Sequence, residues 1–285
     1  MGSPSPISRI AIWGLGRVGT GFALALNDLP ISLYLFSTSE ASRERASNLG
    51  LEVEASQDSW SQKAQEADII AFAWSDDALS KAVRTCTFEP SSTQLLVHFS
   101  GLLNADDLGE TAALKASLHP LAACPSPRAA EMVFKNGPLV LEGSRDAIAR
   151  LESLTQSLGA DIHYLREGQK APYHAGAVLG SNALIGLLHA ALEEWNRAGL
   201  HNGEQLILSL AQSALDGAHT HGLRDGLTGP LKRADQGSIE KHLNTLESDR
   251  LSLYKILNRE LIQLLGEGHF NQKTILKLQE LLKED

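Results

Sequence analysis

The sequence predicts an α/β fold, in which a doubly wound parallel sheet is followed by an all-α C-terminal domain. A glycine-rich turn stands near the start of the chain, between an apolar run and a helical pattern. Strand-like and helix-like segments then alternate to about residue 166, which is typical of parallel strands joined by helices. From there to Asp285 the pattern is helical throughout. We therefore predict two domains, at residues 1–166 and 167–285.

The glycine-rich turn follows the apolar run at residues 10–13 and has the spacing G-x-G-x-x-G. The first glycine permits a tight turn, the second lets the backbone approach a pyrophosphate, and the third lets the next helix pack closely. A helix at about 18–27 would aim its free N–H groups at the phosphates. The turn indicates a Rossmann-like dinucleotide-binding domain. Its predicted cofactor-binding residues are Gly14, Leu15, Gly16, Arg17, Val18 and Gly19.

The end of the second predicted strand bears on which dinucleotide is bound. Enzymes that use NAD usually place an acidic residue there to hold the ribose 2′-hydroxyl. This chain has Ser37 and Thr38, with Arg43 on the helix that follows. Hydroxyl and guanidinium groups suit a 2′-phosphate, so NADP is predicted and NAD is less favoured. Glu40 keeps NAD open, and the arginine could instead be a solvated helix charge.

The remaining strands place polar residues at their carboxyl ends, where ligands bind in open α/β sheets. Trp74, Ser75 and Ser100 are predicted beside the nicotinamide, and His119 is a candidate catalytic residue. His98 lies inside its strand, where a histidine is more often part of the core. The further strands are predicted at 31–36, 68–74, 94–101, 116–120, 139–142 and 161–165, with an extended piece at 51–53. The helices between them are predicted at 59–67, 77–85 and 144–158, with Asp76 or Asp77 as the cap of the second.

The C-terminal domain begins with a helix predicted at 169–197, which is almost wholly apolar between residues 175 and 192. This stretch approaches the length of a membrane span, but it contains Ser181, Asn182 and His189 and is rich in small residues. We predict a helix buried on every side in a soluble domain, with no membrane contact. Amphipathic helices are predicted to follow at 203–219, 238–265 and 272–282.

Polar residues on this helix are candidates for catalysis. Lys170, His174 and Ser181 lie along one face, with Tyr173 and Asn182 beside them. A lysine or histidine here could protonate the oxygen or nitrogen that gains charge when hydride reaches a C=O or C=N bond. Alternatively, Lys170 and Tyr173 are surface residues of the first turn, and Asn182 caps a loop. A second candidate site is the turn at 227–235, where Arg233 could bind a carboxylate or a phosphate.

Composition excludes several classes of function. The net charge of −9 without a basic cluster argues against nucleic acid and anionic membranes as partners. The two cysteines, Cys86 and Cys124, lack metal-ligand spacing, which predicts no metal site and a reducing compartment. Residues 1–6 lack the basic and apolar regions of a signal peptide and are expected to be a short disordered lead-in. The expected location is therefore the cytoplasm.

These motifs together resemble a bacterial family that joins a Rossmann-like NADP-binding domain to a helical domain of unknown function. The family is similar in architecture to pyrroline-5-carboxylate reductase and the 6-phosphogluconate dehydrogenase-like enzymes. The resemblance implies that Lys170 or His174 and Asn182 take catalytic roles, and that the chain forms a homodimer through its helical domain. Trp74-Ser75 stands where relatives commonly have Val-Pro. The segments that carry the resemblance are 14–19, 98–101, 117–121, 170–174, 181–182 and 227–230.

The leading hypothesis is an NADP-dependent oxidoreductase that reduces a small C=O or C=N compound in a cleft between the domains. A second hypothesis is a non-catalytic NADP-binding sensor or regulatory protein. A third is a scaffold with a vestigial nucleotide fold. The sequence does not name the substrate, which is expected to be a small molecule.

Overall fold

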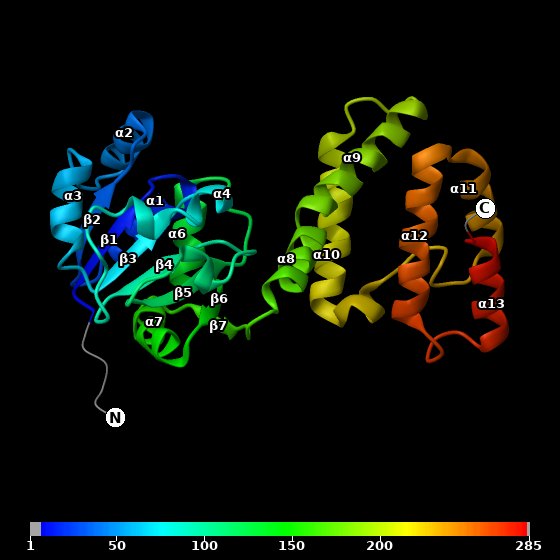
Figure 1. Cartoon of the computed structure of the whole chain (residues 1–285). Helices are drawn as coiled ribbons and strands as arrows, with labels where there is room; N and C mark the ends of the chain where they lie inside the picture. The colour runs from blue at the N-terminus through cyan, green and yellow to red at the C-terminus, as the bar shows by residue number, and fades with distance from the viewer. Residues whose placement is uncertain (1–6, 284–285) are drawn as a thin grey trace. The chain divides into compact units, whose positions relative to one another are not determined.

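The sheet in the computed structural model has seven strands in the order β2-β1-β3-β4-β5-β6-β7 (Figure 1). The structure describes residues 7–283, without the side chain of Val83, so the predicted lead-in at 1–6 lies outside the described residues. Contacts divide the chain into two units, 1–181 and 182–285, while the boundary predicted at 166/167 follows the last strand. The strands are β1 Arg9–Trp13, β2 Ser32–Phe36, β3 Ile69–Phe72, β4 Leu95–His98, β5 Leu114–Pro120, β6 Pro138–Gly143 and β7 Asp161–Tyr164.

The predicted doubly wound sheet is confirmed as mostly parallel, with one antiparallel pair of strands. Strands β1 to β5 pair in parallel, but β6 runs antiparallel to β5 and parallel to β7. Leu139 pairs with Pro120, the last residue of β5, so the chain re-enters the sheet at the end where it left. The connection between them contains α6 (Pro127–Asn136), a helix that the sequence analysis missed.

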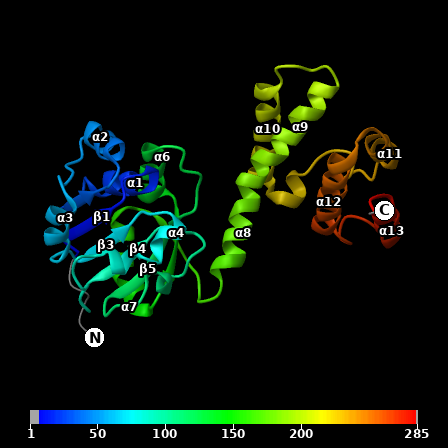
Figure 2. The same cartoon turned by 45° about the horizontal axis from the view of Figure 1, so that its top comes forward.

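Helices cover both faces of the sheet (Figures 1 and 2). On one face α1 (Arg17–Leu26) packs on α6, where a methyl group at Gly21 would lie 2.4–2.9 Å from α6 atoms, so glycine allows this approach. The rings of Phe22, Phe99 and Phe134 meet there, with centroids 4.9–5.6 Å apart. The helices of this unit are completed by α2 Glu40–Asn48, α3 Gln57–Ala64, α4 Asp76–Leu79, α5 Ala82–Thr85, η1 Ala105–Leu108, α7 Arg145–Ser157 and α8 Lys170–Gly180.

Several local predictions need correction. Residues 51–53 form no strand, and the helix predicted at 77–85 is two short helices, α4 and α5. Ser75 occupies the N-cap position of α4, so Asp76 and Asp77 lie in its first turn and neither is the cap. Acidic side chains are favourable in that turn because they face the positive end of the helix dipole.

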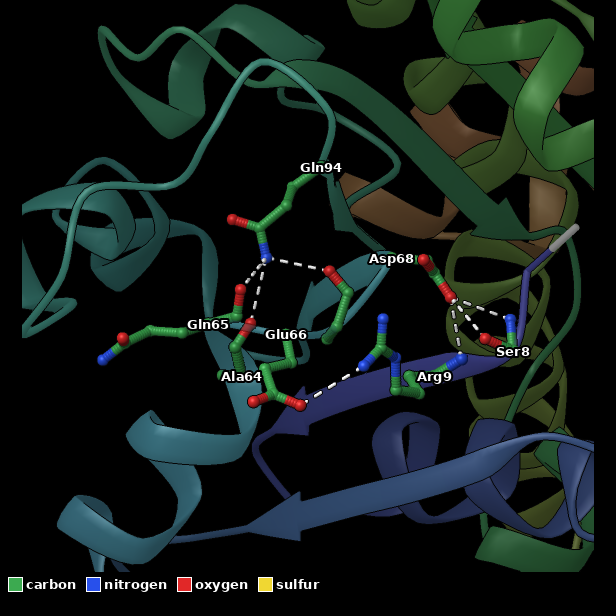
Figure 3. A network of polar contacts seen from close by, with 8 residues as sticks. Ser8, Arg9, Ala64, Gln65, Glu66, Asp68 and Gln94 are labelled. Atoms are coloured by element: carbon green, nitrogen blue, oxygen red, sulfur yellow. Dashed lines mark hydrogen bonds and ion pairs between the residues drawn. The ribbon is translucent and has the colours of Figure 1, made fainter. Parts of the chain in front are cut away.

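A polar network joins the amino-terminal ends of three strands (Figure 3). The Asp68 carboxylate accepts hydrogen bonds from the backbone N–H groups of Ser8 and Arg9, at 2.8 and 2.9 Å. The buried Gln94 amide donates to the carbonyl oxygens of Ala64 and Ala67, at 3.0 and 2.8 Å. These contacts hold the amino-terminal ends of the three strands together, at the end of the sheet opposite to the glycine-rich turn.

The second unit is wholly helical over its described residues, but two predicted helices are broken. The helix expected at 169–197 breaks at Ser181, whose backbone angles are φ −127° and ψ −79°. The helix expected at 238–265 breaks at residues 246–247, where Leu246 and Glu247 are extended. The helices are α9 Asn182–Arg197, α10 Glu204–Gly226, α11 Gln236–Thr245, α12 Ser248–Leu265 and α13 Gln272–Leu281.

The apolar helix is not buried on every side, which is a second correction to its prediction. Leu179 is 71% exposed and Ile185 is 63% exposed. Residues 170–197 are apolar and long enough to cross a membrane by composition, yet the break leaves helices of 11 and 16 residues. Each is shorter than the roughly 20 residues that a span needs. An apolar pattern shows that a surface must be covered, but not what covers it.

Candidate functional site

The glycine-rich turn lies where the strand order changes direction, between β1 and β3, which is where ligands bind in such sheets. Gly14 has φ +111°, and a methyl group there would lie 2.5 Å from the carbonyl oxygen of Ala73. A methyl group at Gly19 would overlap the carbonyl oxygen of Gly14. A methyl group at Gly16 would meet nothing within 4 Å. The fold itself therefore requires the first and third glycines, while the second faces open space.

Helix α1 presents free N–H groups beside Gly16. This glycine is its N-cap residue and makes no side-chain capping bond, and no acidic residue occupies the first turn. Unsatisfied N–H groups and the helix dipole together favour an anion at this place. Among the other predicted residues of the turn, Leu15 is buried in the core, Arg17 is exposed and Val18 packs against the core. Leu15 can therefore contact a ligand through its backbone alone.

The structure brings Ser37 and Arg43 together at the end of β2. The Arg43 guanidinium donates a hydrogen bond to the Ser37 carbonyl oxygen at 2.5 Å, and the Ser37 hydroxyl accepts from the backbone N–H of Ser39 at 3.3 Å. Thr38 is exposed beside them. Arg45, in contrast, donates to the hydroxyl of Ser42 on its own helix. Of the two arginines, Arg43 is thus the one held at the strand end.

Trp74 and Ser75 follow β3, directly beside the glycine-rich turn. The Trp74 ring packs edge-on against Trp13 and Phe72, with centroids 5.0 and 5.1 Å away. The same ring would lie 3.1 Å from a methyl group on Gly14. Trp74 therefore forms one wall of the turn, and exposed Ser75 begins α4 at its rim.

A buried lysine joins β4, β5 and the start of α8. Lys170 is 2% exposed, and its ammonium donates to the Ser100 carbonyl oxygen at 2.7 Å and to the Ser117 hydroxyl at 2.6 Å. The Ser117 hydroxyl donates in turn to the same carbonyl at 3.1 Å. Burial lowers the pKa of Lys170 to about 8, and Glu142, Asp76 and Asp107 oppose this shift by favouring the cation. Lys170 is therefore an enclosed charge that holds the chain at Ser100.

The loop after β4 is fixed by two further side chains. The Ser100 hydroxyl accepts the backbone N–H groups of Leu102 and Leu103, at 3.1 and 3.0 Å. His98 Nδ1 accepts the N–H of Ser100 at 3.1 Å, and Nε2 lies 3.0 Å from the Asn104 carbonyl oxygen. These partners require a neutral ring with its proton on Nε2. Burial first and the Lys170 charge second lower the pKa of His98 to about 4.

Two imidazole rings converge on the loop at Gly101. A methyl group on Gly101 would lie 2.6 Å from His174 Nδ1 and 2.9 Å from His119 Nε2, so any side chain at this position would displace both rings. His119 Nδ1 lies 2.6 Å from the Tyr173 hydroxyl. Burial first, then the positive charge of Lys170, lowers the pKa of His119 to about 4, and burial raises that of Tyr173 to about 12. Both groups are neutral near pH 7.

Three of the four predicted catalytic residues, Lys170, His174 and His119, lie around Ser100 and Gly101. Asn182 is the first residue of α9, in the second unit, and its role stays a prediction. The Ser181 hydroxyl, at the C-terminal end of α8, donates to the Ala177 carbonyl oxygen. Arg233 is exposed in the second unit. No metal-binding group of three or more His, Cys, Asp or Glu residues occurs within the described part of the chain.

The cluster also contains residues that the sequence analysis did not select. Ser117 pairs with His98 in the β4–β5 register, so the strand pairing places its hydroxyl next to the Ser100 carbonyl. Tyr173 was considered only as a neighbour, although it stands one residue before His174. Gly101 follows Ser100 directly, and a glycine after a strand-end polar residue is the signal that could have revealed it.

Comparison with known proteins identifies part of the chain. Residues 137–261 match a family model described as Domain of unknown function (DUF2520). This match and the similar structures below confirm the resemblance inferred from the motifs, with a Rossmann-like sheet ahead of a helical C-terminal region. No curated protein matches the chain in sequence.

Solved structures support the same fold over nearly the whole chain. Protein TM1727 from Thermotoga maritima has a TM-score of 0.71 and 21% identity, covering 90% of this chain and 98% of its own. BF3122 from Bacteroides fragilis, provisionally described as an NADP oxidoreductase, has a TM-score of 0.69 with the same identity and coverage. An imine reductase from Aspergillus terreus, in complex with NADPH4 and dibenz[c,e]azepine, has a TM-score of 0.56 and 12% identity, covering 98% and 93%.

Proposed function

We propose that this protein is an NADP-dependent oxidoreductase that reduces the C=O or C=N bond of a small molecule. The observation that carries the proposal is the open space beside Gly16 at the start of α1. Glycine has no side chain to fill this space, and the free N–H groups of the helix face it. A pyrophosphate needs this kind of cradle. The names of two similar structures, an NADP oxidoreductase and an imine reductase in complex with NADPH4, agree with it.

The residues present fit a dinucleotide along the carboxyl ends of the strands. The backbone of residues 14–19 would hold the pyrophosphate, and Ser37, Thr38 and Arg43 would hold the 2′-phosphate. Trp74, Ser75 and Ser100 are proposed to border the nicotinamide, which supplies a hydride when bound. No carboxylate accepts a hydrogen bond from Arg43 in the described part of the chain, so its charge remains available to a phosphate.

The substrate end of the site is proposed to include His119, His174 and Lys170, all of the first unit. Asn182 stays a predicted catalytic residue. His174 Nδ1 is buried against Gly101 and has no hydrogen-bond partner, so a proton there would be poorly satisfied. We propose that the His174 ring orients a substrate oxygen or nitrogen. Lys170 is enclosed by Ser100 and Ser117, so it acts on the site through its charge.

The proposal is tested by fluorescence titration with NADPH and NADH, followed by NADPH oxidation with a panel of keto acids, ketones and cyclic imines. We expect NADPH to bind more tightly than NADH. Arg43→Ala should weaken NADPH binding by about 10-fold or more without affecting NADH, as expected for one charge-assisted contact. Arg45→Ala is the matched control and should leave both affinities unchanged. Equal affinities for the two nucleotides would contradict the NADP assignment.

An NADP-binding sensor or regulatory protein is the alternative function, favoured by the closed position of Lys170. It predicts NADPH binding without oxidation by any member of the panel. A scaffold with a vestigial nucleotide fold would bind neither nucleotide. The titration and the panel therefore separate all three functions.

We also propose that the partner is a second copy of this chain, bound through the helical region of a cytoplasmic protein. Large apolar side chains on α10 stand in solvent, and Leu210 is 59% exposed. Burying such side chains is favourable by about 25 cal/mol per Å² of apolar surface. Sedimentation analysis should show a dimer that Leu210→Arg weakens, whereas a wild-type monomer at all concentrations would contradict this partner. The other exposed apolar side chains of α8 to α10 are Val178, Leu179, Ile185, Leu206, Leu208, Leu215 and Leu223.

A further inference from the structure

The His119–Tyr173 pair joins the end of β5 to the first turn of α8. His119 Nδ1 and the Tyr173 hydroxyl are 2.6 Å apart, and their rings meet edge-on with centroids 5.6 Å apart. On its other side, the His119 ring turns Nε2 toward Gly101. One ring nitrogen therefore has a fixed hydrogen-bond partner, while the other faces the loop at which the proposed substrate residues converge.

The position of the proton within this pair follows from acidity. A phenol hydroxyl is a stronger acid than the N–H of a neutral imidazole, and an imidazole nitrogen is a better acceptor than a phenol oxygen. Tyr173 therefore donates its O–H to Nδ1, and the ring proton of His119 lies on Nε2. Which nitrogen carries the proton is decided by the hydrogen bond at the other nitrogen.

Lys170 fixes the charge of the pair without being able to reach a substrate itself. Lys170 is 2% exposed, and its ammonium is directed to Ser100 and Ser117. Burial and this nearby positive charge keep His119 neutral near pH 7, so the imidazolium form does not supply the proton.

We propose that His119 and Tyr173 form a proton relay, in which His119 Nε2 protonates the substrate and Tyr173 resupplies His119 through Nδ1. This inference rests on the proposed reductase function and adds the identity of the proton donor. His119 is then the catalytic residue. Tyr173 acts through it and is a positioning residue, as is Gly101, which admits the ring.

The relay balances in atoms and charge. Hydride from the reduced nicotinamide forms a C–H bond at the substrate carbon, and the electron pair of the C=O or C=N bond moves to oxygen or nitrogen. That atom takes the proton from His119 Nε2 while the Tyr173 O–H bond breaks and its proton passes to Nδ1. A neutral histidine with its proton on Nδ1 and a tyrosinate remain. To restore the starting state, Nε2 takes a proton from water, the Nδ1 proton returns to the tyrosinate, and the hydroxide left in solvent is neutralised by buffer.

The first test compares Tyr173→Phe with Tyr254→Phe. Tyr254 is a matched control because its hydroxyl also bonds a histidine Nδ1, that of His242, in the second unit. With a panel compound that the wild type reduces, Tyr173→Phe should lower kcat by about 100-fold, the scale of general acid catalysis, with KM and the Kd for NADPH unchanged. Tyr254→Phe should change none of them. Full kcat in Tyr173→Phe would overturn the relay while leaving the reductase function in place.

The second test needs neither cofactor nor substrate. ¹⁵N NMR of the wild-type histidine rings should show the His119 proton on Nε2, and Tyr173→Phe should move part of the population to the Nδ1 tautomer. A wild-type proton on Nδ1 would overturn the relay, because Tyr173 could then not resupply that nitrogen. If NADPH binds but no panel compound is reduced, the reductase function fails and the relay fails with it.

Discussion

Two histidine–tyrosine pairs in this chain have the same geometry and different surroundings. In both the ring centroids are 5.6 Å apart at 85°, and a tyrosine hydroxyl lies near a histidine Nδ1, at 2.6 Å for His119–Tyr173 and 2.9 Å for His242–Tyr254. The first pair is partly buried beside an enclosed lysine and a strand end. The second joins α11 and α12 through an exposed hydrogen bond. Because the internal geometry is nearly the same, a difference in function between the two pairs would have to come from their surroundings.

The largest expected effect comes from a substitution that prevents NADPH from binding near the first pair. Gly16→Val places a side chain where the pyrophosphate would lie and should weaken NADPH binding by about 1000-fold, the equivalent of two or more charge-assisted contacts. In wild type, NADPH should shift the ¹⁵N signals of His119 and leave those of His242 in place. Gly16→Val should abolish the shift without lowering Tm, because its Cβ meets nothing within 4 Å. Equal shifts at both histidines would break the comparison.

Lowering the pH should destabilise the folded protein, because it favours protonation of His98 near the first pair. The pKa of His98 is about 4 in the folded protein and about 6.5 in the unfolded chain, so between these values the unfolded state binds more protons. The contribution of His98 to stability is complete above pH 6.5 and is lost as the pH falls to 4. For this fully buried ring the loss is about 3 kcal/mol. Urea unfolding at pH 7 and pH 4.5 measures this loss together with that of His119, whose pKa is also lowered to about 4, and a pH-independent unfolding free energy would contradict both neutral rings.

Removing the enclosed charge should change the first pair and spare the second. Lys170→Met should raise the pKa of His119 above about 4, although only in part, because burial is the larger cause of its depression. It should also cost about 1–3 kcal/mol of stability, since the Ser100 carbonyl and the Ser117 hydroxyl lose a partner. NMR titration follows His119, with the His242 signals as the internal control. An unchanged His119 titration would show that the lysine charge does not reach the pair.

The smallest effect is expected from crowding the ring of His119. A methyl group in Gly101→Ala would press on His119 Nε2 and His174 Nδ1 and shift both rings slightly. Turnover should fall by about 10-fold, because a displacement of less than 1 Å is enough to disturb a reacting geometry. Gly176→Ala is the control, since no atom lies within 4 Å of its Cβ position. Equal turnover in the two variants would place Gly101 outside the site.

The elements that the sequence predicted correctly are those with local signals. The glycine-rich turn and the seven strands depend on residue types and periodicities within a few residues of one another. The missed helix α6 also had a local signal, because Ser126 caps it and Pro127 stands at its first position. The antiparallel placement of β6 had none, since it depends on how that helix packs against α1.

The sequence predicted several residues of the candidate site, but not the hydrogen bonds that join them. Lys170 lies 53 residues from Ser117 and 70 from Ser100 in the chain, so their hydrogen bonds could not be read from spacing. His119 and Tyr173 are 54 residues apart. The apolar helix failed for a different reason, because hydrophobicity indicates burial without specifying whether the covering surface is part of the same chain.

The three glycines of the turn differ in what an evolutionary lineage would lose by replacing them. Substituting Gly14 or Gly19 damages the fold, so selection for folding alone would retain both, even in a protein that no longer met a nucleotide. Substituting Gly16 costs the fold nothing, because its side-chain position is open. A lineage released from nucleotide binding would therefore be free to drift at Gly16 first. The residue found at this position in descendants of this chain would therefore record whether nucleotide binding was kept.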